Sequence, residues 1–111
     1  MAYDEEFAHR IREQLADERD LTEMPMFGGL AFLLAGNMAV AISSRGGLMV
    51  RLGAQAAEDA LSDPAAGQMQ MGKRPMRGWV IVEPAGVSTT RSLQKWVRRG
   101  VRFARTLPPK S

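Results

Sequence analysis

The stretch MPMFGGLAFLLAGNMAVAISS, residues Met24 to Ser44, contains no charged side chain. A bilayer-spanning helix needs roughly 20 mostly apolar residues, so the length alone is compatible with a membrane segment. However, Pro25 and the pairs Gly28-Gly29 and Gly36-Asn37 divide the stretch into pieces too short to cross a membrane. A β-hairpin explains it better, with a glycine bulge at Gly28-Gly29 that bends one long strand and a tight turn at Gly36-Asn37. We therefore expect no membrane partner.

Both faces of this predicted hairpin are apolar. A two-residue turn at Gly36-Asn37 places Leu33 opposite Val40 on one face and Phe32 opposite Ala41 on the other. An antiparallel sheet with one face in water normally alternates apolar and polar residues. Either helices cover both faces, or one face is buried against a second copy of the chain or against another protein. With few helices in so short a chain, we expect a homodimer.

Length, cysteine content and charge restrict the class of protein. The chain of 111 residues has room for one domain with one core, and it has no cysteine for disulfides or thiolate metal sites. Its opening, MAYDEEF, is acidic where a secretory signal is basic, which favours a cytoplasmic location. Residues 1–71 carry five Arg and eleven Asp or Glu, whereas residues 72–111 carry ten Lys or Arg against Glu83 alone. Such polarity attracts an acidic partner, or is neutralised within the fold or across a dimer.

The remaining elements follow from hydrophobic periodicity and turn residues. In the first helix, Phe7, Ile11 and Leu15 form one apolar stripe. The predicted elements are a helix at 4–17, strands at 23–35, 38–43 and 48–52, a helix at 54–62, strands at 68–71 and 79–82, and a helix at 89–106. The prediction is a single α+β domain over residues 1–111, a two-layer antiparallel sheet with helices in the order α-β-β-β-α-β-β-α.

The last predicted helix carries a row of five cations opposite an apolar face. At about 100° per residue, the cations lie within an arc of about 80°. They are Arg91, Lys95, Arg98, Arg102 and Arg105. Such a row is typical of a solvated helix face, but it also suits nucleic-acid phosphates or an acidic protein surface. Aromatic residues between the cations would favour nucleic acid, yet Trp96 and Phe103 lie on the opposite face.

The sequence offers little for catalysis. His9 is the only histidine and lies on the polar side of the first helix. The segment Gly72-Lys73-Arg74 lacks the glycine spacing and the Ser or Thr of a phosphate-binding loop, and no His or Cys pair has metal-ligand spacing. We therefore expect no catalytic residue, no cofactor and no metal site.

One cluster of cations lies beside a large aromatic residue. Lys73, Arg74 and Arg77 precede Trp79, which suggests either a loop that holds an anion or ligand beside the indole, or simply a turn leading into a strand. Several methionines are expected to pack nearby, either as core filling or as an adaptable binding groove. These are Met24, Met26, Met69, Met71 and Met76.

Four motifs together resemble the N-terminal domain of the TfoX family, named after bacterial regulators of competence genes. The motifs are Met26-Phe27-Gly28-Gly29, Gly36-Asn37-Met38-Ala39, Arg74-Pro75-Met76-Arg77-Gly78-Trp79-Val80 and Trp96-Val97. The resemblance covers nearly the whole chain. It implies a secretion-chaperone-like α+β fold and a bacterial cytoplasmic protein without established enzymatic activity, with Met26, Phe27, Gly28 and Gly29 as determinants of the fold.

The expected function is a non-catalytic regulatory or protein-interaction module, with nucleic-acid binding through the basic helix as the alternative. Full-length competence regulators of this type carry a second, C-terminal domain. This chain stops at Pro108-Pro109-Lys110-Ser111, so an activity that needs the second domain is not expected from it.

Overall fold

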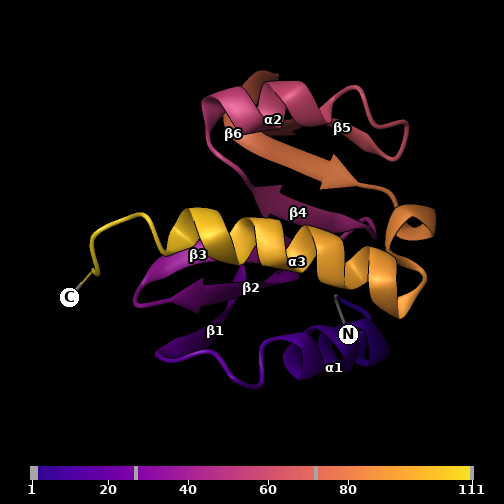
Figure 1. Cartoon of the computed structure of the whole chain (residues 1–111). Helices are drawn as coiled ribbons and strands as arrows, with labels where there is room; N and C mark the ends of the chain where they lie inside the picture. The colour runs from indigo at the N-terminus through magenta and orange to yellow at the C-terminus, as the bar shows by residue number, and fades with distance from the viewer. Residues whose placement is uncertain (1–2, 27, 72, 111) are drawn as a thin grey trace.

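The computed structural model describes residues 3–26, 28–71 and 73–110, which form three α-helices, a short 3-10 helix and one sheet (Figure 1). The elements are α1 (Glu5–Gln14), β1 (Leu21–Met26), β2 (Gly29–Leu34), β3 (Asn37–Ile42), β4 (Leu48–Arg51), α2 (Ala54–Ala60), β5 (Ala66–Met71), β6 (Arg74–Val82), η1 (Pro84–Val87) and α3 (Thr90–Ala104). The sheet has six strands in the order β1-β2-β3-β4-β6-β5, and all neighbours are antiparallel. The predicted α+β class is confirmed.

The predicted single bent strand over residues 23–35 is wrong, because the chain reverses there. Met26 pairs with Gly29, so β1 and β2 form a hairpin rather than one strand. Gly28 has a φ of 78°, which glycine adopts without strain. A Cβ atom at Gly29 would collide with the carbonyl oxygen of Ile42 in β3. The glycine pair thus permits a reversal and a close approach, and it adds one strand to the predicted order.

The predicted register of the β2–β3 hairpin is also wrong. Its turn is Ala35-Gly36, with φ values of 52° and 84°, the left-handed pair that a type I′ turn requires. Leu33 consequently pairs with Met38, and Phe32 pairs with Val40 across a bulge.

Asn37 is the first residue of β3 instead of a turn residue, and its side chain contacts the C-terminal segment. Its Nδ2 donates to the carbonyl of Pro108 at 2.9 Å, and the Lys110 amide donates to the carbonyl of Ala35 at 2.8 Å. Asn37 is 2% exposed. The C-terminal segment therefore packs on the turn and satisfies a buried amide.

All three α-helices pack on one face of the sheet. Directly paired residues share a face, so the pairing connects Phe32, Val40, Val50 and Val80 in one row. This row joins buried residues of all three helices in a single core, among them Ile11, Ala57, Leu93 and Trp96. In Figure 1, α3 lies across the sheet between α1 and α2.

The neighbouring row projects from the opposite, helix-free face. It runs across all six strands through Met24, Ala31, Ala41, Met49, Ile81 and Gly67. None of these residues belongs to the helix-covered core of the described chain. Both hairpin faces are apolar, as predicted.

Side-chain hydrogen bonds cap the first turns of α1 and α3, and a glycine lets α3 pack closely on the sheet. The Asp4 carboxylate accepts hydrogen bonds from the amides of Glu6 and Phe7 at the start of α1. Thr89 and Ser92 form a capping box at the start of α3. Midway along α3, a Cβ atom at Gly100 would lie 2.6 Å from the carbonyl oxygen of Ala39, so α3 approaches the sheet backbone directly.

The β5–β6 hairpin is longer than predicted. β5 begins at Ala66 instead of Gln68, and β6 begins at Arg74 instead of Trp79. Pairing of Gln70 with Pro75 extends the hairpin beyond the apolar residues on which the prediction rested.

Candidate interaction sites

Two members of the predicted cation row, Lys95 and Arg105, form ion pairs within the fold. Lys95 Nζ lies 3.3 Å from Asp63 Oδ2, and Arg105 Nη2 lies 3.1 Å from Glu18 Oε1. The amide of Ala65 and the Lys95 ammonium hold the pKa of Asp63 below its ordinary value. Basic residues of the second part of the chain thus neutralise acidic residues of the first part.

Three members of the row remain exposed on α3. Arg91, Arg98 and Arg102 make no salt bridge with any residue in the described ranges. Within the part of the chain that the structure describes, three cations of the predicted row of five therefore lack an ion-pair partner.

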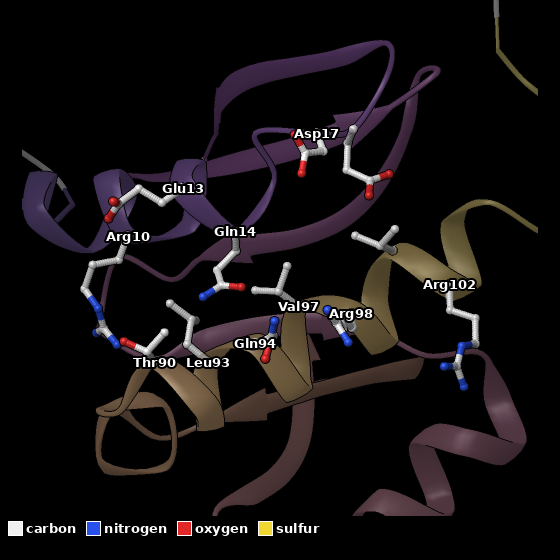
Figure 2. Close-up of a pocket in the computed structure, with 12 residues that line it drawn as sticks. Arg10, Glu13, Gln14, Asp17, Thr90, Leu93, Gln94, Val97, Arg98 and Arg102 are labelled. Atoms are coloured by element: carbon white, nitrogen blue, oxygen red, sulfur yellow. The ribbon is translucent and has the colours of Figure 1, made fainter.

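A groove of about 600 Å³ separates α1 from α3 (Figure 2). At one end, Arg10 Nη2 donates to the carbonyl of Val87 at 2.9 Å, and at the other end Arg105 binds Glu18. Between these contacts, Gln14 projects from α1 toward α3.

The two walls of this groove carry opposite charges. Glu13 and Asp17 line the α1 side, and Arg98 and Arg102 belong to the α3 side. A phosphate backbone that follows α3 on this side would meet carboxylates as well as guanidinium groups. This geometry weakens the case for nucleic acid.

The predicted anion loop is only partly assembled. Arg77 and Trp79 line a hollow of about 350 Å³ beside α2, together with Glu58. Lys73 and Arg74 are exposed and do not line it. The four residues therefore do not converge on one anion position.

A second hollow, of about 380 Å³, lies on the helix-free face. Its apolar lining consists of Met26, Met38, Ala41, Ile42, Met49, Met69, Met76 and Trp79, and its polar lining of Ser43, Ser44, Arg45 and Gln70. The hollow exists because short Ala41 lies among long methionine side chains. None of the described residues that line it is a carboxylate or an imidazole, so it suits apolar docking rather than acid-base chemistry.

Methionine is segregated to this face. Of the predicted methionines, Met26, Met69 and Met76 line the hollow, and Met24 lies in the row that crosses it, 47% exposed. The side chain of Met71 lies outside the described residues. Met38 and Met49 were not predicted to belong to this methionine cluster. The sheet face on which their side chains lie depends on the strand register, which the sequence did not show.

Metal chemistry has no evident centre in the ranges that the structure describes. No group of three or more His, Cys, Asp or Glu side chains there has metal-binding geometry. His9 is exposed and lies 3.9 Å from Glu13 at Nε2, on the outer side of α1. No helix within the described ranges is long and apolar enough to cross a membrane.

The profile of the TfoX N-terminal domain matches residues 13–104. The chain belongs to the TfoX N-terminal domain family. No curated protein and no solved structure matches it. The resemblance inferred from the motifs is thereby confirmed.

In this TfoX N-terminal domain, the first motif has both a structural role and a surface role. Gly28 provides the left-handed turn, and Gly29 provides the contact with the β3 backbone. Met26 lines the hollow on the helix-free face. Phe27 lies outside the described residues.

Proposed function

We propose that this TfoX N-terminal domain is a non-catalytic, cytoplasmic bacterial regulatory module that acts through protein interaction and self-associates as a homodimer. The observation that carries the proposal is the helix-free face, on which a row from Met24 to Ile81 presents apolar side chains while every helix lies on the other side. An uncovered apolar sheet face of this kind marks an interaction surface.

A second copy suits this face because its centre is uncharged. The row through Ala31, Ala41, Met49 and Ile81 contains no charged residue, so two copies meet without like-charge repulsion. Met24 is exposed and Met49 and Ile81 are partly exposed on this row, so a second copy removes their apolar surface from water.

Light scattering of the full chain at micromolar concentration tests the proposal. A particle of twice 12.2 kDa supports the homodimer, whereas a particle of 12.2 kDa overturns it.

A matched pair of charge insertions locates the interface. Leu33 pairs with Met38 on the helix-free face, whereas Ala39 is fully buried against Leu34 and Ala104 under α3. Leu33→Glu is expected to give a folded monomer, and Ala39→Glu is expected to unfold the chain. A Leu33→Glu variant that stays dimeric would exclude this face as the interface.

The alternative, nucleic-acid binding, rests on Arg91, Arg98 and Arg102, the members of the cation row that make no salt bridge within the described residues. It predicts binding at low salt that weakens steeply as salt rises, and further weakening in the double variant Arg98→Ala, Arg102→Ala. Arg45→Ala provides a control for loss of positive charge away from α3, because Arg45 lines the hollow on the opposite face. Absence of any gel retardation of DNA or RNA by the wild type at low salt would end this alternative.

A further inference from the structure

The two faces of the sheet differ in sulfur content. All six methionines whose side chains the structure describes lie on the helix-free face, five around the hollow and Met24 at its side. The buried core contains Leu, Ile, Val, Ala, Phe and Trp, with no methionine among the described residues. A need for apolar surface alone does not explain this separation, because the core meets that need with aliphatic side chains.

Thioethers differ from aliphatic side chains in two ways: they are flexible, and they are oxidised by peroxides. We propose that the helix-free face is an oxidation-sensitive contact surface, on which conversion of methionine to methionine sulfoxide releases the second copy. This inference rests on the proposed homodimer and names its regulation.

The chemistry requires only a peroxide as co-reactant. One oxygen atom of hydrogen peroxide bonds to the methionine sulfur while the O–O bond breaks. The sulfur loses two electrons, and the departing oxygen takes up the proton of the transferred hydroxyl and leaves as water. The product is a polar sulfoxide in place of an apolar thioether.

The position of the methionines determines the consequence. The polar groups that line the hollow belong to Ser43, Ser44, Arg45 and Gln70. Met38 and Met49 line the hollow together with these groups, and Met24 lies beside it in a row of apolar side chains. Oxidation there replaces an apolar thioether with a polar, chiral sulfoxide, which disrupts a methionine-rich contact with a second copy. The core under the helices contains no methionine among the residues that the structure describes, so oxidation is expected to leave the fold of each protomer intact.

The test uses the full chain treated with hydrogen peroxide. Mass spectrometry counts sulfoxides at about 16 Da each, and peptide mapping assigns them. Light scattering is expected to show a dissociation constant raised at least tenfold, with an unchanged circular dichroism spectrum. Treatment with a methionine sulfoxide reductase and dithiothreitol is expected to restore the dimer.

The matched variant replaces the hollow's five methionines, Met26, Met38, Met49, Met69 and Met76, together with Met24, by leucine. Leucine keeps the face apolar at similar volume and removes the sulfur. This variant is expected to remain dimeric in peroxide. A fallback variant, Met38→Leu with Met49→Leu, tests the same point if the sixfold variant does not fold.

The outcomes separate the two proposals. A wild-type dimer that persists with mapped sulfoxides at Met38 and Met49 overturns the oxidation proposal and leaves the homodimer intact. A leucine variant that dissociates in peroxide as the wild type does also overturns it. An untreated wild type of 12.2 kDa overturns the homodimer and, with it, this inference.

Discussion

The two faces of this sheet use the same strands but different side chains. Under the helices, Phe32, Val40, Val50 and Val80 interlock with α1, α2 and α3. One residue away along each strand, the opposite face presents alanine, methionine and isoleucine. Ala31 is fully buried although it lies on the face that no helix covers. A buried residue in this sheet therefore does not by itself indicate a packed core.

The largest expected difference between the two faces is the loss of unfolding free energy when one side chain of each face is truncated to alanine. Phe32→Ala is expected to lower the free energy of unfolding by about 3–5 kcal/mol, because it leaves a cavity under α3. Met49→Ala is expected to cost less than about 1 kcal/mol in the monomer, because Met49 is partly exposed. Urea denaturation in the Leu33→Glu background measures both without dimerisation. Equal losses would contradict the distinction between the faces.

Two glycines sharpen the comparison. Gly100→Ala is expected to destabilise the chain by about 1–3 kcal/mol, because the new methyl group meets the Ala39 carbonyl oxygen at 2.6 Å and displaces α3. At Gly67, on the helix-free row, the nearest atom to a Cβ lies 3.7 Å away, which is ordinary contact. Gly67→Ala is expected to be neutral or to stabilise by about 0.5 kcal/mol. Thermal unfolding of the two variants compares them, and similar melting temperatures would refute close packing of α3.

The smallest effect on stability is expected from the Arg12–Glu23 ion pair, which lies between α1 and β1 at the partly exposed edge of the helix-covered face. Arg12 Nε lies 2.7 Å from Glu23 Oε2, and this hydrogen bond holds the pKa of Glu23 below its ordinary 4.5. The folded state therefore favours the charged carboxylate, so its contribution is present above pH 4.5 and disappears as pH falls through the lower folded pKa. Glu23→Gln should lower stability by less than about 1 kcal/mol at neutral pH.

The pH dependence provides the check on that variant. The difference in unfolding free energy between wild type and Glu23→Gln is expected to shrink as pH falls through the lowered folded pKa of Glu23. Glu58→Gln, an exposed change on α2, serves as the control. A difference that stays constant from neutral to acid pH would show that the carboxylate charge is not responsible.

Much of the fold was predictable because periodicity is local. The stripe of Phe7, Ile11 and Leu15 and the cap at Thr89 predicted α1 and α3 within a few residues. The two hairpin errors arose where glycine allows several backbone paths. Composition did not distinguish a bulge from a reversal at Gly28-Gly29, or a turn at Ala35-Gly36 from one at Gly36-Asn37.

The candidate sites were less predictable because they depend on contacts between distant segments. The cation row on α3 was visible in the sequence, but the partners of Lys95 and Arg105 lie on a loop after α2 and on the segment after α1. The apolar character of both hairpin faces was predictable. Which methionines gather at one hollow was not, since a single-residue change in register moves Met38 or Met49 to the other face.

The contact between the C-terminal segment and the β2–β3 turn also implies an order of assembly. The Asn37 side chain donates to a carbonyl that lies 71 residues later in the chain. Synthesis of α3 must precede this hydrogen bond, because α3 lies between Asn37 and Pro108 in the sequence. Until the C-terminal segment docks on the turn, the side-chain amide of Asn37 can donate only to water. Closure of this end of the sheet is therefore a late folding step.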